Sequence, residues 1–116
     1  MTNPKQATES PLFVRFYALM QWLVQRVEKF PRSQRFILGS RLLDTAFGCH
    51  ALLVRARKVT GATRQEALLQ ADVNLETIRL QLRLAHDLRC LTIEQYEYGS
   101  RLLLDVGKLL GAWRKG

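Results

Sequence analysis

The residues best suited to chemistry are two cysteine–histidine groupings, Cys49-His50 and His86-x-x-x-Cys90. Residues four apart on a helix share a face, so His86 and Cys90 could approach one metal ion together. Adjacent helical residues diverge by about 100°, so only one of Cys49 and His50 could join them. A three-ligand zinc site or a catalytic thiol–imidazole pair would require that convergence. Two free thiols and two ordinary histidines fit the same pattern, and we favour this interpretation.

Signature motifs of other catalytic classes are missing from the sequence. It contains no GxxxxGK[ST] phosphate loop, no GxGxxG dinucleotide loop and no HExxH zinc motif. Helical di-iron proteins use Glu-x-x-His pairs, but Phe47 and Arg83 stand three residues before the two histidines. We therefore predict a protein that is not an enzyme and that holds no metal or cofactor.

Basic residues are the remaining candidates for a function. Eighteen Lys+Arg against ten Asp+Glu give a formal net charge of +8, which attracts polyanions. The segment from Arg32 to Arg64 holds seven basic residues and a single acid, Asp44. Most of the basic residues are arginine, whose forked donors fit phosphate and also fit carboxylates on a partner protein. The charge pattern therefore indicates either a nucleic-acid backbone or an acidic protein surface as the partner.

A membrane location is disfavoured by the length of the apolar runs. The longest uncharged runs, Phe16–Gln25 and Thr45–Val54, fall well short of the roughly 20 residues needed to span a bilayer. The polar start MTNPKQATES has no apolar secretory core. Two cysteines without an export signal are typical of reduced thiols. We expect no membrane association and a cytoplasmic location.

Helices must position these residues, because apolar residues recur at helical spacing and no strand-like alternation is present. A first helix is expected over residues 11–30, where a Ser-Pro pair caps its start and a Phe-Pro pair ends it. A second is expected over 33–58, before a Thr-Gly pair. Capping boxes at Thr63–Glu66 and Thr92–Gln95 predict the starts of a third and a fourth helix.

Short connections of about three to five residues favour antiparallel neighbours. We therefore predict an all-α, up-down-up-down antiparallel four-helix bundle over residues 10–116, preceded by a loose tail over residues 1–9. The residues predicted to face its core are Phe13, Phe16, Tyr17, Met20, Val24, Val27, Ile37, Leu38, Leu42, Ala46, Leu52, Leu53, Ala56, Leu68, Leu75, Ile78, Leu82, Ala85, Leu88, Tyr96, Leu102, Leu103, Val106, Leu110 and Trp113.

Three separated runs resemble a known family. They are Phe30–Gly39, Leu82–Thr92 and Val106–Lys115. Together they are similar to the accessory variability determinant (Avd) proteins of diversity-generating retroelements. This four-helix-bundle family is related to proteins encoded by intervening sequences in bacterial 23S ribosomal RNA genes. The similarity covers residues 10–115 and is more specific than any single short motif.

The resemblance implies a ring-like homopentamer in the cytoplasm of a bacterial host cell. Such a protein associates with the reverse transcriptase of its element and binds RNA and DNA, supporting mutagenic retrohoming without catalysis of its own. An alternative is a structural homo-oligomer whose arginines dock a protein partner, with nucleic-acid binding incidental. The binding residues expected under the resemblance are the basic positions Arg32, Arg35, Arg41, Arg55, Arg57, Lys58, Arg79, Arg83 and Arg89.

Overall fold

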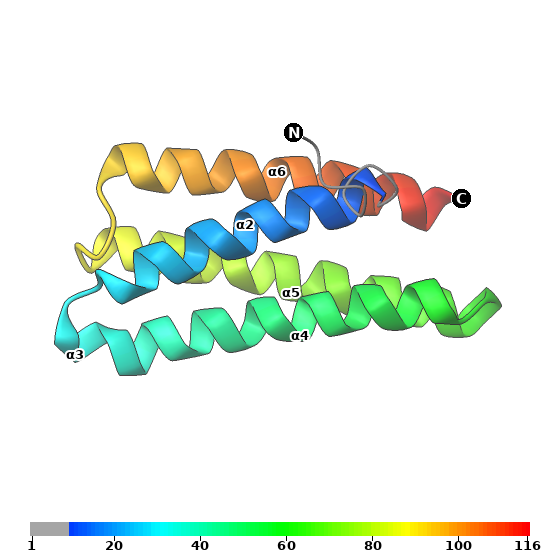
Figure 1. Ribbon diagram of the computed structural model, residues 1–116, viewed down its shortest axis with the longest axis horizontal. Helices are drawn as coiled ribbons and strands as arrows, with labels where there is room; N and C mark the ends of the chain where they lie inside the picture. The colour runs from blue at the N-terminus through cyan, green and yellow to red at the C-terminus, as the bar shows by residue number, and fades with distance from the viewer. Residues whose placement is uncertain (1–9) are drawn as a thin grey trace, which may run out of the picture.

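Four long helices make up most of the part of the chain described by the structure, a computed structural model covering residues 10–116. They are α2 (Pro11–Glu28), α4 (Ser40–Lys58), α5 (Gly61–Asp87) and α6 (Ile93–Lys115), each antiparallel to the next along the chain (Figure 1). Residues 10–116 contain no strand. The predicted all-α, up-down-up-down bundle is confirmed, while the predicted tail at residues 1–9 lies outside the described residues.

Side-chain caps start two of the four long helices, α2 and α6. The Ser10 hydroxyl accepts a hydrogen bond from the Phe13 amide (3.5 Å) at the start of α2. The Thr92 hydroxyl accepts from the Gln95 amide (3.1 Å) and the Gln95 side chain accepts from the Thr92 amide (3.0 Å). This capping box starts α6 and confirms the prediction for that helix.

The capping box predicted at Thr63–Glu66 is wrong. Helix α5 begins at Gly61, with Thr60 as the N-cap and no side-chain capping bond. Gly61 adopts a φ of 60°, which glycine tolerates without steric cost and which turns the chain directly into the helix. The turn is therefore made by the backbone before the capping residues are reached.

The second predicted helix contains a wide turn near its start. The short α3 (Arg32–Gln34) passes into a π-helical turn, η1 (Arg35–Gly39), and then without a break into α4. A side chain at Gly39 would collide with Val27, so glycine lets this segment approach the end of α2 closely. The turn leaves Phe36 and Ile37 on the outside, 70% and 65% exposed, and the prediction of Ile37 as a core residue is wrong.

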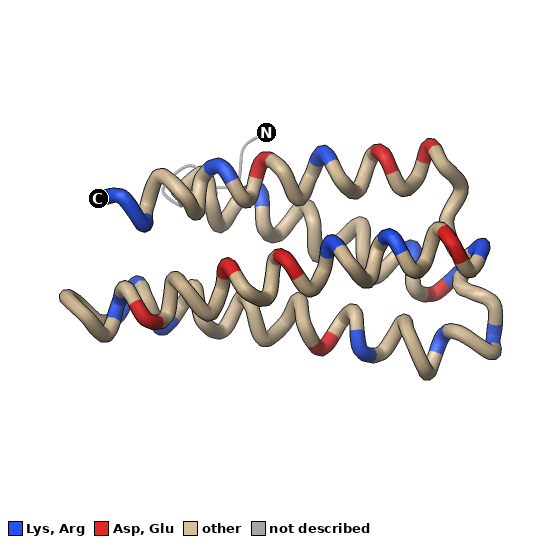
Figure 2. Tube along the Cα trace, turned by 180° about the vertical axis from the view of Figure 1, so that it is seen from behind, with Lys and Arg blue, Asp and Glu red and all other residues tan. Residues whose placement is uncertain are grey.

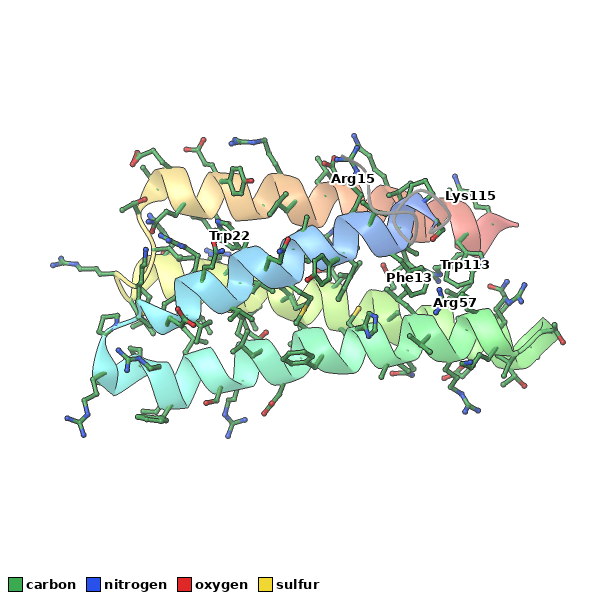
Figure 3. All side chains as sticks on the ribbon, viewed as in Figure 1. Phe13, Arg15, Trp22, Arg57, Trp113 and Lys115 are labelled. Atoms are coloured by element: carbon green, nitrogen blue, oxygen red, sulfur yellow. The ribbon has the colours of Figure 1, made fainter. Side chains whose placement is uncertain are left out.

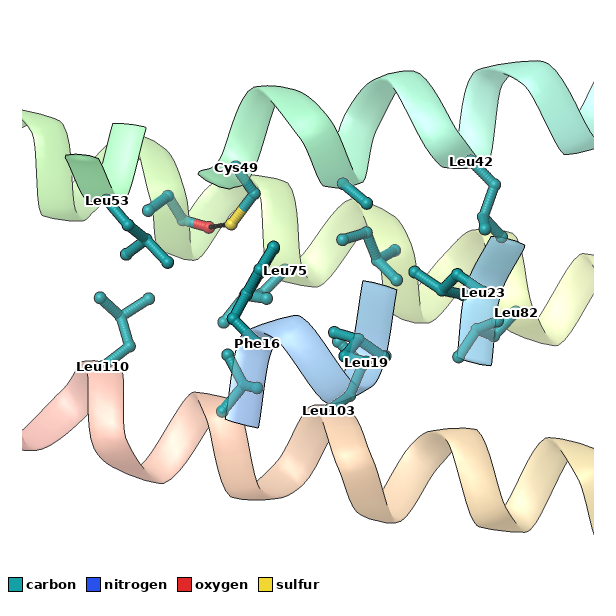
Figure 4. Close-up of a cluster of buried hydrophobic side chains, with 14 of the residues drawn as sticks. Phe16, Leu19, Leu23, Leu42, Cys49, Leu53, Leu75, Leu82, Leu103 and Leu110 are labelled. Carbon is teal, nitrogen blue, oxygen red and sulfur yellow. Dashed lines mark hydrogen bonds between the residues drawn. The ribbon is translucent and has the colours of Figure 1, made fainter. Parts of the chain in front are cut away.

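One apolar core runs between the four long helices (Figure 4). Every long helix contributes to it, and burial of each large side chain stabilises the fold by about 1.5–3 kcal/mol. The largest fully buried side chains are Phe16, Leu19, Leu23, Phe30, Leu42, Leu53, Leu68, Leu75, Ile78, Leu82, Leu103 and Leu110.

Three more residues that we predicted to be in the core lie on the surface. Tyr17 and Val24 are exposed on the side of α2 that faces α4, and Leu88 is exposed at the end of α5. Helical periodicity identifies the apolar arc of a helix, but it does not tell how much of that arc its neighbours cover. The bundle therefore carries apolar surface outside its core.

Helix α2 is held against α6 by Trp22. The indole of Trp22 lies directly on Gly99, where an added Cβ would overlap the ring. The same ring packs against the Tyr98 ring, with 5.9 Å between the centroids. Only glycine leaves room for this contact, which draws α2 toward α6 and away from α4.

Replacing Gly99 with Ala is expected to destabilise the fold by about 1–3 kcal/mol, because the added methyl must displace a large, partly buried ring. The matched control is Gly111→Ala on the same helix, where an added Cβ meets no atom within 4 Å. That control should be neutral or stabilising by up to about 1 kcal/mol through helix propensity. Urea unfolding followed by circular dichroism measures both changes. Equal effects of the two substitutions would contradict the Trp22 contact.

Candidate nucleic-acid and partner interface

Eight of the nine predicted binding residues divide between the two ends of the bundle, and Arg79 lies farther inside α5. One end, the α3 end, is formed by α3, η1 and the loop between α5 and α6, and the other, the α4–α5 end, lies where α4 turns into α5 (Figures 1 and 2). Because α4 rises about 1.5 Å per residue, roughly 21 Å of helix separates Arg41 from Arg55, the nearest members of the two groups along α4. The basic residues between Arg32 and Lys58, which form one cluster in the sequence, therefore form two separate clusters in the folded protein.

The α3 end collects arginines from four segments. Arg32 lies on α3, Arg35 on η1, Arg41 in the first turn of α4, and Arg89 in the loop after α5. All four side chains are exposed. Arg83, one turn before the end of α5, is exposed as well. The antiparallel topology thus joins positions that are more than forty residues apart in the sequence.

Arg89 has an unusual backbone conformation for its residue type. Its φ is 63°, in the left-handed region, and the Cys90 amide beyond it donates to the Ala85 carbonyl (2.7 Å). This is the usual geometry of a helix C-terminus that ends on glycine. An arginine there costs about 1–2 kcal/mol relative to a relaxed backbone. The position presents the Arg89 side chain at the very end of α5.

At the α4–α5 end, Arg55, Arg57 and Lys58 occupy the last turn of α4. The Arg57 guanidinium lies over the Phe13 ring, 4.2 Å from its centroid, which fixes its position beside α2. Lys115, the last residue of α6, lies toward the same end (Figure 3). We did not predict Lys115 as a binding residue, although the antiparallel order alone places the end of α6 on the side of the α4–α5 turn.

Few of these charges are neutralised within the protein. Arg79 pairs with Glu76 (2.7 Å) and is half-buried. Among residues 10–116, the other eight predicted residues make no ion pair within 4.0 Å, and all eight are exposed. Arg114, on α6, is paired with Asp72 (3.2 Å). Both ends therefore present unneutralised guanidinium and ammonium groups to the solvent.

The two cysteine–histidine groupings do not come together. The Cys49 thiol is buried and donates to the Ala71 carbonyl (3.5 Å), whereas Cys90 lies in the loop after α5. His50 packs against the Phe13 and Phe16 rings, and His86 packs against Tyr96. In the described part of the chain, no group of three His, Cys, Asp or Glu side chains could hold a metal ion.

One helical segment, Arg32–Lys58, is long and apolar enough to cross a membrane by length and composition alone. A core helix of a bundle passes the same test. Leu42, Ala46, Cys49 and Leu53 from this segment are buried against the other helices, so its apolar character serves the core. The segment gives no more than weak support for a membrane span.

Comparisons with known proteins indicate what kind of protein this is. The model of a family described as bAvd-like matches residues 12–116. A crystal structure at 1.70 Å resolution of a protein of unknown function, from the S23 ribosomal protein family of Bacteroides thetaiotaomicron, has a similar fold. Its TM-score is 0.68 at 22% identity, over 89% of this chain and 91% of that one. No curated protein matches the sequence.

Reactivity of the two thiols is expected to differ strongly. Burial, and to a lesser degree the charge of Asp72, raises the pKa of Cys49 to about 12, and burial also raises the pKa of Cys90. A rise of about three pKa units leaves Cys49 roughly a thousandfold less thiolate, the reactive form, at pH 8. In a disulfide-exchange assay on the native protein, only Cys90 should react quickly, and Cys90→Ser should remove that phase. Rapid reaction of the Cys90→Ser protein would contradict the buried position of Cys49.

Proposed function

The chain belongs to the bAvd-like family, the bacterial Avd proteins, and we propose that it binds nucleic acid and a reverse transcriptase to support mutagenic retrohoming. The resemblance seen in the sequence is thereby confirmed at the level of the family. Membership implies an accessory role in a diversity-generating retroelement, in a family whose members are generally not catalysts. The binding partners and their contact residues are our proposal.

The observation that carries this proposal is the charge at the two ends of the bundle. Eight exposed basic side chains there make no ion pair among residues 10–116. Nucleic-acid backbones carry regularly spaced phosphates, and neutralising them releases condensed counterions, which favours binding. Arginine, the commoner basic residue here, donates in a fork that fits a phosphate group.

Binding on these terms depends on the backbone of the nucleic acid and is weakly selective for sequence. RNA, DNA or a hybrid duplex would therefore be bound through phosphates, with a steep dependence on salt. We further propose that the protein acts as a homo-oligomer, a pentamer by analogy with the family, in the bacterial cytoplasm.

A second candidate is a structural assembly protein whose arginines dock an acidic protein surface. The observation in its favour is the exposed apolar surface outside the core, which nucleic-acid binding does not require. Under this alternative, reversing the charge of Arg32, Arg35 and Arg41 would abolish the complex with the reverse transcriptase even after nuclease treatment. Survival of that complex after the reversal would favour nucleic acid as the ligand of the α3 end.

Neutralising Arg35 and Arg41 together is expected to weaken binding to an RNA–DNA hybrid. The slope of log K against log salt should fall by about 1 for each phosphate that the protein no longer neutralises. The control is Arg101→Ala, an exposed arginine on α6 that stacks on Tyr98, 5.8 Å from its centroid, away from both ends. Fluorescence anisotropy over a range of salt concentrations measures both. A slope that is unchanged in the double variant, or binding that is insensitive to salt, would overturn the proposal.

Arg89→Gly separates binding from stability. Glycine relieves the left-handed strain, so the free energy of unfolding should rise by about 1 kcal/mol. Removal of the guanidinium should at the same time weaken hybrid binding, measured in the same anisotropy assay. A stabilised protein with unimpaired binding would remove Arg89 from the interface and leave its backbone strain without a functional reason.

A further inference from the structure

An apolar groove lies between α2 and α4, on the side where these two helices pack most loosely. It has a volume of about 600 Å³. Its walls are Tyr17, Met20 and Val24 from α2 and Phe47 and Val54 from α4. Phe47 is 58% exposed although it lies on a helix of the core. Because Trp22 draws α2 toward α6, this side of the bundle stays open.

A separate apolar surface lies on α5, and we call it the α5 stripe. It consists of Leu69, Val73, Leu80 and Leu84, which are 41–57% exposed. Spacings of four, seven and four residues place all four on one face of the helix. The buried residues of α5 include Leu68, Leu75 and Leu82, which face the core, so the stripe lies outside the bundle.

The groove and the stripe lie at matching heights along the bundle axis. The Cys49 thiol reaches the Ala71 carbonyl (3.5 Å), and the Gln81 side chain donates to the Thr45 hydroxyl (3.1 Å). These contacts set the segment of α4 around Phe47 level with the segment of α5 between Ala71 and Gln81. If copies of the chain are related by rotation about an axis parallel to the helices, equivalent residues of all copies lie at the same height. The stripe of one copy would then lie level with the groove of the next and could contact it.

The two surfaces also differ in charge. Arg57 is the one charged side chain that lines the groove, and Glu66, three residues before Leu69, is an exposed acid beside the stripe; neither makes an ion pair among residues 10–116. Arg64 donates to the Ala56 carbonyl (2.9 Å), which places the first turns of α5 level with the last turn of α4. Together with the Cys49–Ala71 contact, this places Glu66 level with Val54, a wall residue of the groove, and about one helical turn from Arg57 along the axis. Contact between the two surfaces of neighbouring copies would oppose charges of opposite sign.

We propose that the groove between α2 and α4 is occupied by the α5 stripe of a second copy of this chain. The contact joins two different surfaces, so an open assembly leaves one groove and one stripe unoccupied until a ring closes. Both surfaces run along the sides of the bundle, which leaves the two basic ends uncovered. This inference rests on the homo-oligomer in the proposed function and assigns its contact; phosphate binding by the ends does not depend on it.

The test uses one substitution on each surface and a matched control. Phe47→Glu blocks the groove, and Leu80→Glu blocks the stripe; both positions are more than half exposed, so neither removes a core side chain. Leu104→Glu is the control, because Leu104 on α6 is 50% exposed and belongs to neither surface. Light scattering should give an oligomer for the wild type and for Leu104→Glu, and a monomer for each of the two surface variants.

Mixing the two monomeric variants decides whether the contact joins different surfaces. The Leu80→Glu protein keeps its groove and the Phe47→Glu protein keeps its stripe, so the mixture should form a dimer of one copy each and nothing larger. If both variants stay monomeric when mixed, or if either one alone remains an oligomer, the assignment is overturned. Tyr17→Glu and Val73→Glu repeat the test on the same two surfaces should either first variant lose its helical circular dichroism.

A monomeric wild type would also overturn the inference and would leave the groove to another protein partner. Hybrid binding of the monomeric variants, compared per chain, distinguishes this failure from failure of the proposed function. If the wild type is a monomer but still binds the hybrid in a salt-dependent way, only the contact between copies is contradicted. If the wild type is an oligomer but shows no salt-dependent binding, only the nucleic-acid proposal is contradicted.

Discussion

Small buried side chains along the contact between α4 and α5 set the geometry of the molecule. Ala46, Cys49 and Ala56 on α4, with Ala67 and Ala71 on α5, are almost fully buried, and their size lets the helices approach closely. The hydrogen bond from Cys49 to the Ala71 carbonyl fixes the register between the two helices. That register determines which arginines meet at each end and which heights the groove and the stripe occupy.

Unequal packing around this contact accounts for the outer surfaces of the bundle. The contact of the Trp22 ring with Gly99 packs α2 closely against α6. The bundle is therefore tightly packed between α2 and α6 and open between α2 and α4. Charge, by contrast, is concentrated at the helix ends, where Arg32 and Arg35 at one end and Arg55 and Lys58 at the other meet solvent. Apolar sides and basic ends can therefore serve two different partners without competing for surface.

Much of this structure could be predicted from the sequence, and the errors have physical causes. The four helices were predicted from the periodicity of apolar residues, and the start of α6 from the capping box at Thr92. The family was predicted from the resemblance of three sequence runs. Tyr17, Val24 and Ile37 were predicted to be buried because they belong to apolar arcs, but no neighbouring helix covers them. Tyr17 and Val24 line the groove. The division of the arginines between two ends depends on the antiparallel order of the helices, which a count of charge along the chain does not use.

In the proposed assembly, apolar sides hold the copies together while charged ends bind nucleic acid. A change in salt concentration distinguishes these two kinds of contact. Salt weakens contacts with phosphates, whereas it leaves apolar contacts between copies unchanged or strengthens them. The most direct measurement is the light-scattering mass of the wild-type protein with an RNA–DNA hybrid, from about 0.1 M to about 1 M salt. The hybrid should dissociate with rising salt while the mass of the protein assembly stays constant. An assembly that falls to single chains as the hybrid is released would contradict this expectation.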